Sequence, residues 1–196
     1  MYKPIIVILN GSNGAGKDSF VNKVDYTLRF EKSVFGSDRV MVSHLSSISA
    51  IKKMLLTSQY WDGVKDERGR KLLSDVKDAV DKYDKTIITD QLISDVFTIL
   101  ETNDERELSS LVFIDIREPE NIDNTVHKLE EQEEIEVYTV LIKGSEDPVA
   151  NNSADQNVED YAYDYTYTLV HDRSDVLKSC AENFISEIYP RDTQSE

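Results

Sequence analysis

The sequence predicts an α/β fold in which a doubly wound parallel sheet lies between two layers of helices. Three observations lead to this prediction. Short β-branched runs alternate with longer segments of helical periodicity, the first run is apolar throughout, and a glycine-rich turn joins that run directly to a helical segment. A chain of 196 residues is long enough for one such domain, with about five strands.

The predicted strands are short apolar or alternating runs that end at polar or glycine-containing turns. The five predicted strands are residues 4–10, 39–44, 110–116, 136–143 and 165–170. Tyrosines at every second position predict a strand with one tyrosine face, and packing at a sheet edge is favoured over base stacking as their role. These tyrosines are Tyr161, Tyr163, Tyr165 and Tyr167.

The predicted helices have apolar residues three and four positions apart. Residues 86–101 begin like a strand, but apolar residues continue at helical spacing to Leu100, so a helix is favoured. Pro119 suits the first turn of a helix, and Ser174 is the expected N-cap of the last one. The strongest stripe is Leu72, Leu73, Val76, Ala79, Val80 and Tyr83. The predicted helices are residues 17–30, 47–60, 66–83, 86–101, a helix that begins at Pro119, and residues 174–189.

Composition limits the partners of the protein. Lys plus Arg is 22 and Asp plus Glu is 38, which gives a formal net charge of −16. Nucleic-acid polymers and anionic membrane surfaces require a basic face, so neither is expected as a partner. The single cysteine, Cys180, excludes an intrachain disulfide, and no stretch approaches a membrane span or a signal peptide. A cytoplasmic protein with a small-molecule partner is expected, and a homodimer is left open.

Residues 11–17 read Gly-Ser-Asn-Gly-Ala-Gly-Lys, which is the G-x-x-x-x-G-K pattern of a Walker A loop, or P-loop. Backbone N–H groups that turn inward around a phosphate need dihedral angles that glycine adopts without strain. Lys17 supplies a positive charge for the β- and γ-phosphates, and the following helix directs its N-terminus towards the anion. The preceding strand and the following helix favour this interpretation over an ordinary glycine turn. ATP is therefore the expected cofactor, bound by Gly11, Ser12, Asn13, Gly14, Ala15, Gly16, Lys17, Asp18 and Ser19.

The residue after the lysine departs from the common pattern. A Ser or Thr that binds Mg²⁺ normally follows the lysine, whereas this chain has Asp18 and then Ser19. A carboxylate is also a suitable oxygen ligand for Mg²⁺, so either Asp18 or Ser19 can serve. The alternative is that Asp18 only favours the helix N-terminus electrostatically.

The Gly-Lys-Asp-Ser ending of the loop resembles that of a group of P-loop kinases, the phage-type deoxynucleoside monophosphate kinases and the animal-type phosphomevalonate kinases. Two further stretches are similar to segments of these enzymes: Trp61-Asp-Gly-Val-Lys-Asp-Glu-Arg-Gly-Arg-Lys-Leu-Leu-Ser-Asp-Val, and Phe113-Ile-Asp-Ile-Arg-Glu-Pro-Glu-Asn-Ile. The resemblance extends to about residue 143. It implies a three-layer P-loop kinase fold, Mg²⁺-ATP as the phosphate donor, and a small phosphorylated acceptor. Lys143 stands where the group often has an arginine, and residues 152–155 are only similar to its Ser-Glu pair.

Further candidate residues lie at predicted strand and helix ends. Asp115 ends an apolar strand, where a Walker B carboxylate holds Mg²⁺, although a solvent-facing strand end is the alternative. Arg117 suits a catalytic role on the transferred phosphoryl group, and an ion pair with Glu118 or Glu120 is its alternative. Lys65, Arg68 and Arg70 are candidates for binding the acceptor phosphate, or else a solvated helix face.

We therefore predict a single P-loop kinase domain over residues 1–196. It has a helical acceptor-binding insertion at about 46–102 and a polar lid-like loop at about 144–162. Lys17, Arg117 and Asp115 are the expected catalytic residues, and Asp18, Ser19 and Asp115 the expected metal ligands. The favoured acceptor is a nucleoside or deoxynucleoside monophosphate. One alternative is another phosphorylated metabolite as the acceptor. The other is a protein that binds nucleotide with little transfer activity.

The three histidines show no metal-ligand spacing with the one cysteine, so a zinc site is not expected. They are His44, His127 and His171.

Overall fold

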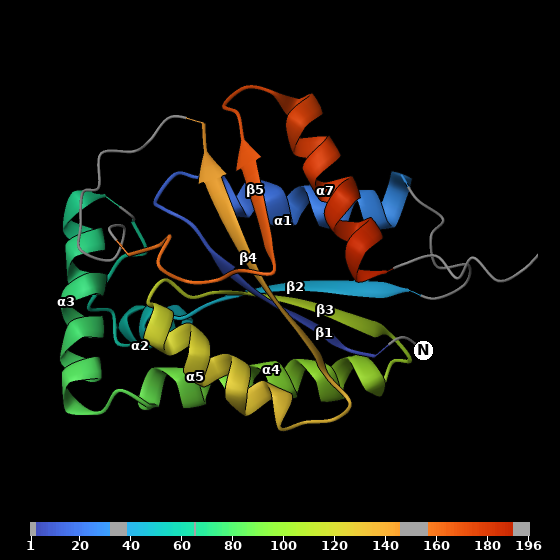
Figure 1. The fold of residues 1–196 in the computed structure, drawn as a ribbon. Coiled ribbons are helices and arrows are strands. Elements are labelled where there is room, and N and C mark those ends of the chain that lie inside the picture. The colour runs from blue at the N-terminus through green and yellow to red at the C-terminus, as the bar shows by residue number, and fades with distance from the viewer. Residues whose placement is uncertain (1–2, 32–38, 65, 146–156, 190–196) are drawn as a thin grey trace, which may run out of the picture.

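The protein contains one five-stranded sheet in which all strands are parallel, in the order β2-β3-β1-β4-β5 (Figure 1). The computed structural model describes residues 3–31, 39–64, 66–145 and 157–189. The strands are β1 (Ile5–Asn10), β2 (Val40–Ser46), β3 (Ser109–Asp115), β4 (Glu136–Gly144) and β5 (Tyr165–Leu169). The helices are α1 (Lys17–Tyr26), which a π-helical turn (Thr27–Glu31) continues, α2 (Ser49–Thr57), α3 (Glu67–Tyr83), α4 (Ile87–Asp104), α5 (Pro119–Glu130) and α7 (Ser174–Ile188).

Strand β1 lies at the centre of the sheet and is buried along its whole length. Its side chains alternate between two apolar clusters. Ile5, Val7 and Leu9 pack in the cluster that includes α1 and α7, whereas Ile6 and Ile8 pack in the cluster that includes α4 and α5. Figure 1 shows these two helix pairs on opposite faces of the sheet. This alternation is the physical basis of the three layers, because a β-strand presents successive side chains to opposite sides.

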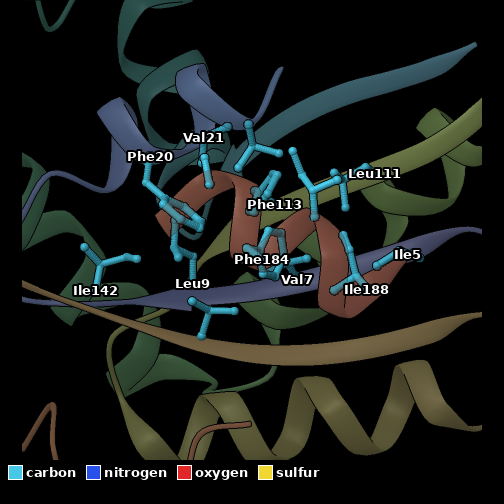
Figure 2. Close-up of a cluster of buried hydrophobic side chains, with 14 of the residues drawn as sticks. Ile5, Val7, Leu9, Phe20, Val21, Leu111, Phe113, Ile142, Phe184 and Ile188 are labelled. Atoms are coloured by element: carbon cyan, nitrogen blue, oxygen red, sulfur yellow. The ribbon is translucent and has the colours of Figure 1, made fainter. Parts of the chain in front are cut away.

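Aromatic rings fill the centre of the cluster beside α1 and α7 (Figure 2). Phe20, Phe113 and Phe184 are fully buried, and their ring centroids lie 5.5 to 6.4 Å apart. Such offset and edge-on arrangements stabilise a core beyond the area that the rings bury. Phe20 belongs to α1, so this packing anchors the helix whose first residue is Lys17.

A third, smaller apolar cluster joins α2, α3 and α4. Trp61 and Leu73 are buried in it. Trp61 Nε1 donates a 3.0 Å hydrogen bond to the carbonyl of Val64, and Asp66 caps α3 by accepting from the amide of Gly69 at 2.7 Å. The Trp61 side chain thus closes the segment 61–64 on itself, and Asp66 starts α3.

The structure confirms most of the expected elements. Residues 86–101 are helical, within α4, and Pro119 is the first residue of α5. Ser174 is the first residue of α7 and not its N-cap; Arg173 holds the cap position, without a side-chain hydrogen bond. In the α3 stripe, Ala79 and Tyr83 are exposed, and Tyr83 is 86% exposed. Val80, between them, still packs against the third cluster, so the buried face of α3 is narrower than the predicted stripe.

The tyrosine run was expected to form one face of a single strand, and this expectation is wrong. Strand β5 begins only at Tyr165. Tyr165 and Tyr167 pack beside α7, whereas Tyr161 and Tyr163 pack against the cluster on the other side of the sheet. The chain therefore passes the sheet edge before the strand begins, and the four rings serve two faces.

Among the described residues, no helix is both long enough and apolar enough to span a membrane.

Candidate functional site

The glycine loop of residues 11–17 joins the carboxyl end of β1 to the first turn of α1. Gly11, Gly14 and Gly16 have φ angles of 147°, 83° and 96°, in the region that glycine tolerates best. A β-carbon on Gly11 would lie 2.3 Å from the carbonyl oxygen of Ile142. The loop therefore starts in direct contact with the backbone of β4, and its path requires glycine at this position.

Lys17 extends back into the loop that precedes it. Its ammonium group donates hydrogen bonds to the carbonyl oxygens of Gly11, at 2.5 Å, and Ser12, at 3.1 Å. The amide of Ala15 closes the loop by donating to the carbonyl of Ser12 at 3.2 Å. Gly16, in the left-handed conformation, is the N-cap of α1, so the N-terminus of the helix and the lysine charge act on the same small region.

Asn10, the last residue of β1, is fully buried and connects three segments around the loop. Its Oδ1 accepts a 2.7 Å hydrogen bond from the amide of Gly11. Its Nδ2 donates to the carbonyl of Arg117 at 3.0 Å and to the hydroxyl of Tyr163 at 2.6 Å. Sequence reasoning treated Asn10 only as the end of a strand, because Arg117 and Tyr163 lie more than 100 residues further along the chain.

Asp115 lies at the carboxyl end of β3, beside the end of β1, since Leu9 and Asp115 are paired in the sheet register. Its Oδ1 is buried and accepts no hydrogen bond of normal geometry. His44 Nε2 is nevertheless only 3.2 Å from this oxygen, which makes the contact an ion-pair approach rather than a directed hydrogen bond. On the other side of the ring, His44 Nδ1 lies 3.7 Å from Oδ1 of Asp18.

Asp18, His44 and Asp115 therefore form one group, with one ligand atom from each residue and all three atoms within 4.8 Å of one another. The structure brings together Asp18 and Asp115, as the metal prediction requires. It adds His44, which sequence reasoning set aside for lack of a spacing pattern. The available signal was a histidine near the end of the second predicted strand, but it becomes informative only once β2 is known to pair with β3.

The electrostatics of this group follow from the two carboxylates. Partial burial alone would lower the pKa of His44. Its interaction with Asp115 and the negative charges of Asp115 and Asp18 outweigh that effect, so the pKa of His44 is raised above its usual value. The group therefore attracts positive charge.

Arg117 follows β3 by two residues and is partly buried. The two acids considered as its partners each bind a lysine: Glu118 lies 2.9 Å from Lys77 and Glu120 lies 3.3 Å from Lys85. Burial alone would raise the pKa of Glu118. The hydrogen bond and charge of Lys77 lower the pKa of Glu118 below its usual value.

The candidate acceptor residues are more dispersed. Arg68 and Arg70 are exposed in the first turn of α3, and Arg68 lines a shallow depression together with Asp66, Glu67 and Lys71. Lys65 lies outside the described residues. Ser19, in the first turn of α1, is exposed.

Most of the expected lid, including residues 152–155, lies outside the described part of the chain. Lys143, which stands where the resembling kinases often have an arginine, pairs with Glu159 at 2.8 Å.

The parallel sheet, the glycine loop after its central strand and the helix that starts at Lys17 together define a three-layer α/β P-loop fold. No protein-family model matches the chain, and no curated protein matches it. Among solved structures, the chain is similar to one described as APE1195, with 14% identity, 96% of both chains covered and a TM-score of 0.49.

The chain is also similar to two structures of the Mycobacterium tuberculosis APS kinase CysC. One is a cysteine-to-alanine mutant, with 16% identity, coverage of 96% of this chain and 99% of that chain, and a TM-score of 0.48. The other is a complex with AMPPNP and APS, with 15% identity, the same coverage and a TM-score of 0.47.

Proposed function

We propose that this protein is an ATP-dependent phosphotransferase that acts on a small phosphorylated acceptor. The observation that carries the proposal is the position of the Lys17 ammonium group inside the glycine loop, with the carboxylates of Asp18 and Asp115 at the same edge of the sheet. A phosphate-binding loop alone fits many proteins. Carboxylates beside it supply the second requirement of phosphoryl transfer, a place for a divalent cation.

In this proposal the loop binds the β- and γ-phosphates of ATP. The backbone amides of residues 11–17 and the N-terminus of α1 present hydrogen-bond donors to the phosphate oxygens. Lys17 exchanges its contacts with the carbonyls of Gly11 and Ser12 for contacts with phosphate oxygens. That exchange is favourable because a full negative charge replaces a carbonyl dipole.

The donor atoms near Lys17 fit a magnesium ion. Mg²⁺ takes oxygen ligands, and the buried Oδ1 of Asp115 accepts no hydrogen bond of normal geometry from the described residues. We assign the ion to Asp115 and Asp18, with Ser19 as the alternative to Asp18. When bound, Mg²⁺ supplies positive charge to the donor phosphates.

The chain's own residues then position the reacting groups. A phosphate oxygen of the acceptor attacks the γ-phosphorus, the bond from that phosphorus to the β,γ-bridging oxygen breaks, and ADP leaves with the electron pair. Arg117 neutralises charge on the transferred group. An acceptor phosphate needs little activation as a nucleophile, so we assign no general base. Catalysis rests on positioning and charge neutralisation.

We propose a nucleoside or deoxynucleoside monophosphate as the acceptor, bound by the helical region at about 46–102. Arg68 and Arg70 in the first turn of α3, with Lys65 before it, are the candidate ligands of the acceptor phosphate. The resemblance of the segment that begins at Trp61 supports this choice. Another phosphorylated metabolite, such as phosphomevalonate, is the alternative acceptor. The proposal includes a cytoplasmic location.

One observation favours a second candidate function, nucleotide binding with little transfer. Lys143, at the position where the resembling kinases often have an arginine, is held at 2.8 Å by Glu159. A cation whose charge is balanced in this way contributes less to neutralising a transferred phosphoryl group.

The test is ATP consumption with Mg²⁺ against a panel of nucleoside and deoxynucleoside monophosphates, with phosphomevalonate included. Lys17→Ala removes the charge inside the loop. Lys85→Ala is the matched control, because Lys85 is an exposed lysine that pairs with Glu120 outside the loop. ATP affinity is measured in parallel by calorimetry.

Turnover on a monophosphate by the wild type and Lys85→Ala, with loss of at least about a hundredfold in Lys17→Ala, would support the kinase and identify its acceptor. Turnover on phosphomevalonate alone would select the alternative acceptor. ATP binding through Lys17 without turnover on any acceptor would select the nucleotide-binding function.

A further inference from the structure

The group formed by Asp18, His44 and Asp115 draws its ligands from three different elements. Asp18 belongs to the first turn of α1, His44 to β2 and Asp115 to the end of β3. These segments are distant in the sequence, and the parallel pairing of β2 with β3 brings two of them together. The convergence is therefore a product of the fold and not of local sequence.

The accessibility of the three side chains suits an ion that enters from solvent. The side chain of Asp18 is 86% exposed, whereas those of His44 and Asp115 are 25% and 21% exposed. The group thus has two ligands held in the sheet and one at the open side. His44 Nε2 approaches the buried Oδ1 of Asp115 to 3.2 Å, but this oxygen accepts no hydrogen bond of normal geometry from the described residues. A buried carboxylate oxygen without an aligned donor is costly, and a cation bound between it and the ring nitrogen would satisfy both groups.

We propose that His44 is a metal ligand, and that it forms with Asp18 and Asp115 a site for a first-row divalent cation such as Mn²⁺, which binds before any nucleotide. This inference deepens the proposed function, since it concerns the ion assigned to Asp18 and Asp115, but the binding itself requires no substrate.

The donor set determines which ions the site favours. Mg²⁺ prefers an all-oxygen environment, whereas an imidazole nitrogen with two carboxylates suits transition-metal ions. Affinities should rise from Mg²⁺ through Mn²⁺ to Co²⁺, in the order expected for mixed nitrogen and oxygen ligands. The three ligand atoms leave further coordination positions for water.

The test uses the full chain without nucleotide and Mn²⁺ as the probe, with free Mn²⁺ measured by electron paramagnetic resonance. The variants are His44→Leu and Asp115→Asn. The matched control is His127→Leu, because His127 also lies near a carboxylate, 3.8 Å from Glu131, but on an exposed helix surface. Circular dichroism and thermal unfolding establish that each variant is folded. Pulsed measurements on bound Mn²⁺ detect coupling to an imidazole nitrogen.

The expected result is one Mn²⁺ ion bound by the wild type and by His127→Leu, with affinity at least about tenfold weaker in His44→Leu and in Asp115→Asn. Nitrogen coupling should be present in the wild type and absent in His44→Leu. The inference is overturned if nucleotide-free protein binds no Mn²⁺, or if His44→Leu binds it as tightly as the wild type. Because no ATP is present, neither outcome depends on whether the protein transfers phosphate.

Discussion

The side-chain amide of Asn10 donates a 2.6 Å hydrogen bond to the hydroxyl of Tyr163, a residue 153 positions further along the chain. Burial raises the pKa of Tyr163 to about 12, so its hydroxyl keeps its proton and donates a 2.8 Å hydrogen bond to the carbonyl of Val158. Through Asn10, this contact reaches the first amide of the phosphate-binding loop and the carbonyl of Arg117. One buried amide thus ties the segment before β5 to both sides of the site.

Replacement of Asn10 should destabilise the protein more than replacement of Tyr163. Asn10→Leu removes the acceptor of the Gly11 amide and the donor to the Arg117 carbonyl and the Tyr163 hydroxyl, so we expect a loss of about 3 kcal/mol in the free energy of unfolding. Tyr163→Phe removes one hydroxyl and should cost about 1 to 2 kcal/mol. Urea denaturation of both variants measures the difference. Equal losses would show that the bond to Tyr163 is the only one of the three that matters.

The first glycine of the loop should tolerate a methyl group less well than the second. In Gly11→Ala the new β-carbon meets the backbone carbonyl of Ile142, which cannot move without disturbing β4. In Gly14→Ala, with φ of 83°, the methyl group enters open space and only the backbone conformation is strained. We expect the free energy of unfolding to fall by more than about 2 kcal/mol in Gly11→Ala and by about 1 kcal/mol in Gly14→Ala. Thermal unfolding of the pair is the measurement, and a smaller loss for Gly11→Ala would contradict the close approach to β4.

The ion pair of Lys77 with Glu118 should make a pH-dependent contribution to stability. Against the effect of burial, the hydrogen bond and charge of Lys77 lower the pKa of Glu118, and the hydrogen bonds and charges of Asp81 and Glu118 raise the pKa of Lys77. The contribution of Glu118 to stability is therefore fully present at pH values above 4.5, its ordinary pKa. It is lost as the pH falls through the lower pKa that Glu118 has in the folded state. The contribution of Lys77 to stability is fully present at pH values below 10.5, its ordinary pKa, and is lost as the pH rises through its raised pKa in the folded state.

Glu118→Gln should therefore lower the free energy of unfolding by about 1 to 2 kcal/mol at neutral pH, between the values for exposed and buried pairs. The difference from the wild type should shrink below about pH 4, as Glu118 becomes protonated. Lys85 and Glu120 form a more exposed pair at 3.3 Å, so Glu120→Gln is the control and should change stability little at any pH. A constant difference for Glu118→Gln down to pH 2 would contradict the lowered pKa.

Truncation of Phe184 should be among the most damaging core substitutions. Phe184 is fully buried in α7, and its ring lies 5.5 Å from that of Phe20, which anchors the helix after the phosphate-binding loop. We expect Phe184→Ala to cost about 3 to 5 kcal/mol. Phe30, which is 73% exposed, provides the control, and Phe30→Ala should cost well under that amount. Chemical denaturation checks both, and comparable losses would place Phe184 outside the main core.

Local patterns identified the parts of this protein whose structure depends on near neighbours. The continuous apolar run of β1, the glycine spacing of the loop and the helical periodicity of α4 each follow from residues a few positions apart. Patterns failed where burial depends on a distant surface. Tyr83 continues the periodicity of α3 but is exposed, and the alternating tyrosines are divided between two faces because β5 starts only at Tyr165.

The sequence by itself determined the fold class, the phosphate-binding loop with Lys17, and the position of Asp115 at a strand end. These follow from spacing within single segments, which backbone geometry converts directly into local structure. Only the tertiary structure decided that His44 stands between Asp18 and Asp115, and that Asn10 reaches Tyr163. Both relationships depend on which strands are neighbours and in what register, and that choice is made by packing of the whole sheet against its helices.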